Sequence, residues 1–287
     1  ILAPELKTSL NMSTEQYAWV VASFQLAYTV FQPICGWLID VIGLKMGFLI
    51  CAGIWAVVCM LHAGAGSWLQ LAILRFFMGG AEAAATPANA KAISDWFPKK
   101  ERPIAAGWAG VGFSIGAMLA PPIIVIAHVS FGWQGAFLFS GGLALIWVVL
   151  WWLFYHSPQQ HPNLSQQELD LIREDNEPVL PKLPFLTSLA SLCKNKKFYG
   201  IAIPAFLAEP AWAVFSFWVP LYLATERGMD LKQIAMFAWL PFLAADIGSV
   251  ASGYLTTLYR KWFGCSRVNS VVASSVTGAF LMVSLAF

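Results

Sequence analysis

The segment GWLIDVIGLK, residues 36–45, separates two long apolar stretches. Gly36 allows a neighbouring helix to approach closely, and Gly43 suits a tight turn because glycine tolerates backbone angles that other residues avoid. Asp40 can face a helix N-terminus, where a negative charge is stabilised. With Lys45 at its end, the segment predicts a short loop between two helices that cross a membrane.

The composition of the whole chain supports a membrane protein. Of 287 residues, 59% are hydrophobic and only 11% are charged, whereas soluble domains carry about 25% charged residues. So few charges cannot cover a water-facing surface, so most of the surface must face lipid. The net charge of +2 is too small to indicate a nucleic-acid partner.

Apolar segments long enough to span a bilayer recur along the chain. An eighth begins near residue 269, and the first residues, ILAP, resemble the end of a preceding helix. We therefore expect a fragment of an all-α polytopic membrane protein, with at least one helix missing before residue 1. The seven expected crossings lie near 16–39, 46–66, 68–92, 104–127, 134–155, 199–225 and 232–259.

The basic residues predict the orientation. Most of them, among them Lys45, Lys99 and Lys100, fall in loops on one side, which the positive-inside rule assigns to the cytoplasm. The polar stretch 156–198 lies on the same side and is expected to be a linker between two helical halves. Within it, the Ser165 and Glu168 pair forms a capping-box pattern that predicts a short surface helix.

Several polar residues stand within the expected crossings. Arg75, Glu82 and Asn89 recur every seven residues, close to two helical turns or about 10 Å, and so form one stripe. Ionisable groups in a membrane are costly and therefore indicate function. A guanidinium can hold a carboxylate bidentately, and a desolvated glutamate can load and release a proton. The alternative is a buried network that only holds helices together.

The second half carries two further acidic candidates, Glu209 and Asp246. Pro210 follows Glu209 and frees a backbone carbonyl, which a spanning helix tolerates mainly where it lines a cavity. Trp212 and Trp218 continue this segment as possible lining residues. Roles in coupling, gating or binding compete here with structural pairing and with rings that face lipid.

Enzymatic and metal-dependent functions find no support in the sequence. GFSIG, residues 112–116, matches the G-x-S-x-G pattern of serine hydrolases, but it lies inside an apolar helix rather than at a strand-to-helix turn. The five cysteines have no CxxC spacing, and the four histidines have no metal-ligand spacing. We expect neither an enzyme nor a cofactor.

The loop at 36–45 resembles the G-x-L-x-D-x-x-G-x-K loop of the major facilitator superfamily, between its helices 2 and 3. Val41 and Leu44 stand where the family often has basic residues. A fainter copy begins with GYL at 253–255 in the second half, as a two-repeat transporter requires. On this register the chain covers helices 2–8 and the start of helix 9: 1–155 as the N-terminal half, 156–198 as the linker and 199–287 as part of the C-terminal half.

The segments RFFMGGAEAA at 75–84 and WFPKKER at 96–102 are similar to the anion:cation symporter family of that superfamily. FLAEPAW at 206–212 and IAMFAWLP at 234–241 resemble bacterial hexuronate permeases. The resemblance implies that the helix-4 arginine and glutamate of the family, which bind the anion and couple its transport, match Arg75 and Glu82. It also implies that Tyr28 lines a sugar-acid site.

The resulting expectation is a transporter of the inner membrane that imports a sugar-acid anion, together with protons or sodium, by alternating access. Substrate would contact Arg75, Tyr28, Asn89 and Trp212, while Glu82, Glu209 and Asp246 would serve proton coupling. A symporter of another organic anion, an exporter of the same superfamily and a non-transporting membrane scaffold remain alternatives.

Overall fold

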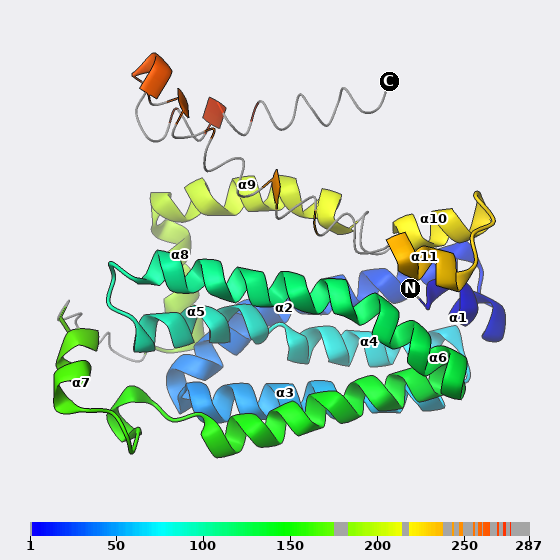
Figure 1. Ribbon diagram of the computed structural model, residues 1–287, viewed down its shortest axis with the longest axis horizontal. Helices are drawn as coiled ribbons and strands as arrows, with labels where there is room; N and C mark the ends of the chain where they lie inside the picture. Colours follow the sequence, from blue (N-terminus) through cyan, green and yellow to red (C-terminus); the bar gives the residue numbers. More distant parts are fainter. Residues whose placement is uncertain are drawn as a thin grey trace.

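The computed structural model describes residues 2–174, 183–213 and 218–237, and scattered positions from 243 to 276. In this part of the chain every regular element is a helix. Figure 1 shows helices α2 to α6 side by side as one bundle, with α9 along one flank. The bounds of the first five helices are α1 Ala3–Ser9, α2 Thr14–Ile42, α3 Leu44–Leu61, α4 Trp68–Glu82 and α5 Ala85–Trp96.

The hairpin predicted from residues 36–45 joins α2 to α3. Gly43 is the single residue between the two helices and has a φ of 90°, a backbone conformation that other residues rarely adopt. Its N–H donates to the Ile39 carbonyl (2.9 Å), and its own carbonyl accepts from the N–H of Gly47 (2.9 Å). The predicted tight turn is therefore confirmed.

The segment 68–92 was expected to form one unbroken helix, and the structure shows two helices instead, so the expected continuity is wrong. Helix α4 ends at Glu82 and α5 begins at Ala85. Pro87 explains the interruption, because proline has no N–H to donate to the carbonyl four residues earlier, that of Ala83. The Ala84 N–H donates to Ala81 instead (3.3 Å), which tightens the turn.

The crossings expected at 104–127 and 134–155 form the two arms of α6, Arg102–Phe154. Gly132 has non-helical angles (φ 72°, ψ 178°) and marks the reversal between them. Figure 1 shows α6 running along the bundle and returning on its other side. Ser114 of the GFSIG segment lies inside the first arm, as expected for a helix rather than a catalytic turn.

The expected linker holds the 3₁₀ turn η2 (Pro158–Gln160) and two helices, α7 (Gln166–Ile172) and α8 (Phe185–Lys194). The predicted capping box is present: the Ser165 hydroxyl accepts from the Glu168 N–H (3.2 Å), and the Glu168 carboxylate accepts from the Ser165 N–H (2.9 Å). Beyond it follow α9 (Lys196–Ala213), α10 (Val219–Thr225) and α11 (Leu231–Phe237). A further 3₁₀ turn, η1 (His62–Gly64), follows α3.

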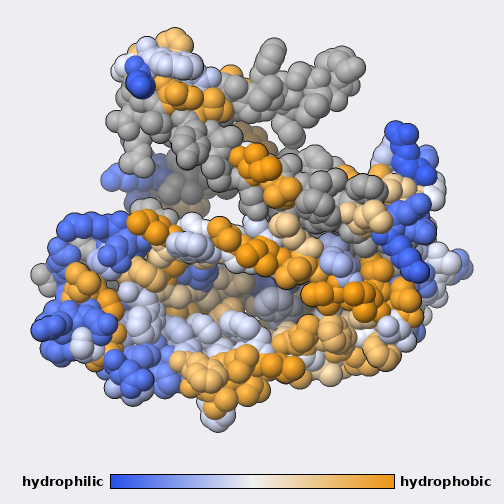
Figure 2. Space-filling view, viewed as in Figure 1, coloured by the Kyte–Doolittle hydropathy of each residue, from blue (hydrophilic) through white to orange (hydrophobic). Residues whose placement is uncertain are grey.

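The apolar surface of the bundle is consistent with a lipid environment. Within the described residues, three stretches are long and apolar enough to cross a membrane: Thr14–Ile42, Leu44–Gly64 and Ile104–Phe154. On α6, Trp108 is 73% and Phe113 75% exposed, and extended exposed apolar surface is rare on soluble monomers. Figure 2 shows hydrophobic residues along the middle of the molecule and hydrophilic ones gathered at its two ends.

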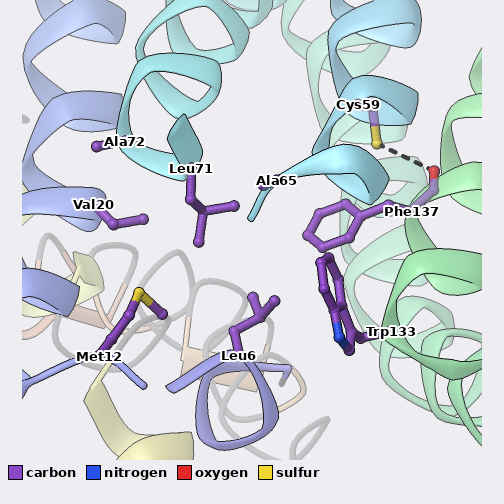
Figure 3. Close-up of a cluster of buried hydrophobic side chains, with 9 residues drawn as sticks. All are labelled: Leu6, Met12, Val20, Cys59, Ala65, Leu71, Ala72, Trp133 and Phe137. Atoms are coloured by element: carbon purple, nitrogen blue, oxygen red, sulfur yellow. Dashed lines mark hydrogen bonds between the residues drawn. The ribbon is translucent and has the colours of Figure 1, made fainter. Parts of the chain in front are cut away.

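Inside the bundle, buried apolar clusters join the helices. One lies near the N-terminus and brings residues of α1, α2, α4 and α6 together. Figure 3 shows Leu6, Val20 and Leu71 on one side of it and the rings of Trp133 and Phe137 on the other. The return arm of α6 packs mainly on α3, where the Cys59 thiol donates to the Phe137 carbonyl (3.8 Å), while α2 packs mainly on α4.

Candidate site between α2 and α4

Helices α2 and α4 approach each other closely, and small residues make this approach possible. A Cβ at Gly79 would overlap the carbonyl oxygen of Phe24. At Gly80 a Cβ would come within 3.4 Å of the Phe31 ring, and the Gly80 carbonyl accepts from the Cys35 thiol at 3.5 Å. Small residues allow such backbone contact in membranes, where dispersion rather than the hydrophobic effect drives helix packing.

Arg75 lies two turns before Glu82 on α4. Its guanidinium carbon is 5.9 Å from the centre of the Phe24 ring on α2, a cation–π distance. Among the described residues, Arg75 has no ion pair with a carboxylate.

Tyr28 continues the array that starts at Arg75. Its ring stacks on Phe24 at a centroid distance of 5.9 Å and an angle of 30°. Its hydroxyl lies 3.2 Å from the Thr86 hydroxyl on α5. Arg75, Phe24, Tyr28 and Thr86 therefore form a continuous path of a cation, two rings and two hydroxyl groups across three helices. We call these four residues the arginine array.

Glu82 occupies the last position of α4, directly before the break. It is partly buried, and Ala83 and Ala84 after it are completely buried. Arg75 and Glu82 both lie on α4, two turns apart, and no ion pair between them occurs among the described residues. Glu82 therefore sits where the backbone changes direction.

Asn89 falls on α5, beyond the break, and its side chain is exposed. No contact of Asn89 with Arg75 or Glu82 is found in the described part of the chain. The straight stripe expected from the seven-residue spacing is therefore wrong, because that spacing assumed an unbroken helix. Thr86 joins the arginine array instead through its contact with the Tyr28 hydroxyl, and no sequence signal marks it.

Residues 36–45, the end of α2, Gly43 and the start of α3, lie at one end of the bundle. Gly36 packs against Pro87, where a Cβ would be 3.4 Å from the proline Cβ, and Asp40 is exposed. The carbonyl of Lys45 accepts from the indole N–H of Trp151 (3.2 Å), which ties the α2–α3 turn to α6.

The remaining candidates cannot be placed at this site. Glu209 and Trp212 belong to α9, but their side chains lie outside the described residues, as does Asp246 altogether. In the described part of the chain no group of histidine, cysteine or acidic side chains is arranged to hold a metal ion.

His62 was missed by the sequence analysis, although it is fully buried. Its ring stacks on Phe137 (5.0 Å, 20°), and its Nδ1 lies 2.7 Å from the Val58 carbonyl. A lone histidine in an apolar segment gives no sequence signal, so only the structure shows that His62 is buried and stacked on Phe137.

Comparison with known proteins agrees with this architecture. The bacterial homologue of the human lysosomal transporter Spinster, solved in an inward-facing, unoccupied conformation, superimposes with a TM-score of 0.64; the match covers 90% of this chain and 57% of that one at 20% identity. That likeness concerns the fold alone.

Sequence relatives are more informative. The hexuronate transporter of Escherichia coli K12 is 46% identical over 286 residues, 98% of this chain, which spans 65% of that protein's length. The galacturonate transporter of Dickeya chrysanthemi is 43% identical over 285 residues. The match covers 98% of this chain and 82% of the length of that transporter. The D-galactonate transporter of Escherichia coli O6:H1 is 26% identical over 293 residues. The resemblance to bacterial hexuronate permeases is thereby confirmed.

The Major Facilitator Superfamily model matches residues 1–287. With the α2–Gly43–α3 turn, the helical bundle and these relatives in agreement, the chain belongs to the Major Facilitator Superfamily of multi-pass membrane transporters.

Proposed function

We propose that the protein imports a hexuronate anion such as glucuronate or galacturonate, together with protons, across a bacterial inner membrane by alternating access. The observation that carries the proposal is the arginine array beside Glu82. The names of the two relatives that share 46% and 43% identity with this chain support the substrate class.

The arginine array has the groups that a sugar acid needs. The Arg75 guanidinium can donate two parallel hydrogen bonds to the carboxylate. The rings of Phe24 and Tyr28 offer apolar faces for the sugar, while the hydroxyls of Tyr28 and Thr86 can exchange hydrogen bonds with its hydroxyl groups. Because no described carboxylate pairs with Arg75, the substrate does not have to displace a partner.

Glu82 is the proposed site of proton coupling. It is partly buried and lies on the same helix as Arg75, two turns further on. A proton on Glu82 and a carboxylate at Arg75 would leave the site close to neutral, which lowers the cost of moving it through the apolar interior. Glu209 and Asp246 of the second half are proposed as further coupling residues. Asn89 of α5 in the first half and Trp212 of α9 in the second are proposed as further substrate contacts.

Contacts between the two proposed halves, 1–155 and 199–287, support a rocking movement. Tyr17 of α2 meets Trp218 edge-on at 5.9 Å, directly before α10. Tyr17, Ala3 and Leu221 form a small buried cluster at this end of the bundle. Gly36, Asp40, Gly43 and Lys45 are proposed to govern the movement at the opposite end.

The proposal is tested in proteoliposomes with labelled glucuronate and an imposed inward proton gradient. Arg75→Lys keeps the charge but loses the bidentate geometry. Since a hydrogen bond to a charged group contributes about 1.5–3 kcal/mol, we expect kcat/KM for uptake to fall about 10- to 150-fold. Arg173→Lys on the exposed linker is the matched control and should leave uptake unchanged.

Glu82→Gln tests the coupling role, with the exposed Glu101→Gln as its control. We expect uptake by Glu82→Gln to lose its response to the proton gradient while exchange of internal for external glucuronate persists. Uptake that stays gradient-driven in this variant would refute the assignment. Gradient-driven uptake of galactonate but not of glucuronate would retain the site and change the substrate.

A further inference from the structure

Helix α8 differs from the other long helices in its direction. Figure 1 shows it running across the end of the bundle, at a steep angle to α2 and α9. This is the end that the positive-inside rule assigns to the cytoplasm. Asn195 separates α8 from α9, and its side-chain oxygen accepts from the Lys197 N–H (3.0 Å), which begins the next helix in a new direction.

Two contacts fix the start of α8 on α2. The indole N–H of Trp37 donates to the carbonyl of Leu183 (3.0 Å). The Trp37 ring also meets the Phe185 ring edge-on at 6.0 Å. Helix α8 is therefore held at the level where α2 leaves the membrane.

The remainder of α8 has an apolar side that the described residues leave uncovered. Leu186, Leu189 and Leu192 recur every three residues and share one side of the helix, and no residue of α8 is buried. Leu186 is 75% and Leu192 45% exposed. Thr187 and Ser191 fall on the opposite side of the helix, so α8 has one apolar and one polar side and is amphipathic.

Positive charge accompanies this apolar side. Lys194, Lys196 and Lys197 are all exposed. Residues 178–208 contain no aspartate or glutamate, and no ion pair of these lysines occurs in the described part of the chain. The charge is therefore not balanced locally, and it lies at the junction of a surface helix and a spanning helix.

We propose that α8 lies in the cytoplasmic surface of the bilayer and binds anionic phospholipids. Leu186 and Leu192 enter the boundary of the acyl chains, and Lys194, Lys196 and Lys197 contact the phosphate-bearing headgroups. An amphipathic helix with lysines and exposed leucines matches such a surface in both respects. Each juxtamembrane lysine strengthens attachment to an anionic leaflet about fivefold. Because α8 precedes α9, the lipid would position the connection between the two halves.

Cys193 allows a direct test. It is exposed, whereas Cys35, Cys51 and Cys59 are buried, so after Cys265→Ser a fluorophore can be attached to it selectively. The labelled protein is placed in nanodiscs of phosphatidylcholine containing increasing amounts of acceptor-labelled phosphatidylglycerol, and energy transfer measures lipid association.

We expect Lys194→Gln, Lys196→Gln and Lys197→Gln together to weaken association with phosphatidylglycerol on the order of 100-fold, from about fivefold for each lysine. The matched control carries Lys7→Gln, Arg227→Gln and Lys232→Gln, which remove equal charge at the other end and should change nothing. Equal association in the two triple variants would overturn the proposal.

The apolar side is tested separately with lipids brominated in their acyl chains. They should quench the Cys193 fluorophore, and Leu186→Ser with Leu192→Ser should abolish the quenching without unfolding, because both side chains are exposed. Absence of quenching in the parent protein would mean that another part of the protein, or a second copy, covers α8, and the proposal would be wrong.

Discussion

Gly79→Ala is the substitution to which the candidate site should be most sensitive. The new methyl group would overlap the Phe24 carbonyl oxygen and lie 3.1 Å from both the carbonyl carbon and Cδ2 of the same residue. Two of these atoms are backbone and cannot rotate away. Helices α2 and α4 must therefore separate, and the hydrogen bond from the Ser23 hydroxyl to the Ala72 carbonyl (2.9 Å) is stretched with them.

The expected loss in the free energy of unfolding of Gly79→Ala follows from the helix contact that the new methyl group disrupts. A gap of 0.5–1 Å forfeits about a quarter to a half of the dispersion energy of each atom pair, and overpacking substitutions cost about 1–3 kcal/mol. Gly53→Ala in the interior of α3 is the matched control, because a Cβ there meets nothing within 4 Å. It should be neutral or stabilise the protein by about 0.5–1 kcal/mol.

Two measurements check this reasoning. Denaturation in mixed micelles, followed by circular dichroism, should show the free energy of unfolding lowered only in Gly79→Ala. Uptake assays should show a higher KM for glucuronate, by about 2- to 10-fold, because Phe24 moves away from Arg75 and their cation–π interaction weakens. Equal stability and equal KM in the two alanine variants would refute the close approach of α2 and α4.

Three other substitutions probe separate contacts. Tyr28→Phe removes one hydroxyl of the Tyr28–Thr86 pair and should raise the KM for glucuronate about 2- to 10-fold; an unchanged KM would exclude this hydroxyl from the site. Trp151→Phe deletes the N–H donated to Lys45, and denaturation should show a loss of about 1 kcal/mol in the free energy of unfolding; no loss would mean that this bond does not hold α6. The backbone N–H and hydroxyl of the N-cap serine lower the pKa of Glu168. The stabilisation of α7 is therefore present above the carboxyl's unfolded pKa and is lost as pH falls through the folded pKa. The protection of α7 amides, measured as exchange relative to the intrinsic rate at the same pH, should fall in that pH range, and Glu168→Gln should abolish this change; protection that falls equally in Glu168→Gln would contradict it.

The sequence predicted those parts of the fold in which one residue type determines the local backbone. Gly43 has a positive φ angle at the predicted tight turn, and the serine N-cap of α7 was recognisable from its spacing to Glu168. Gly132 also has a positive φ angle, between the expected crossings 104–127 and 134–155, but it was not predicted as the turning residue. The break after Glu82 was missed although Pro87 signals it. An apolar stretch shows no periodicity that distinguishes one helix from two. Pro87, the third residue of α5, was therefore treated as part of one expected helix.

The candidate site was predictable only in its charges. Arg75 and Glu82 stand out because ionisable groups are rare in apolar segments. Phe24 does not stand out because it is one of many apolar residues. Thr86 does not stand out because it is a small polar residue near a helix break. Their proximity to Arg75 depends on how α2 crosses α4, which glycine spacing permits but does not specify.

The distribution of packing within the bundle indicates which contacts the proposed movement would break. Within the N-terminal half, α2 and α4 meet through backbone at Gly79, and Ala27 on α2 is completely buried. Such an interface cannot open gradually, because separating it exposes hydrogen-bonding groups and empties close contacts. The contact of Tyr17 with Trp218, by comparison, consists of two ring edges at one end of the molecule. Rocking would therefore separate these rings first and leave the arginine array intact, so that substrate binding and gating reside in different contacts.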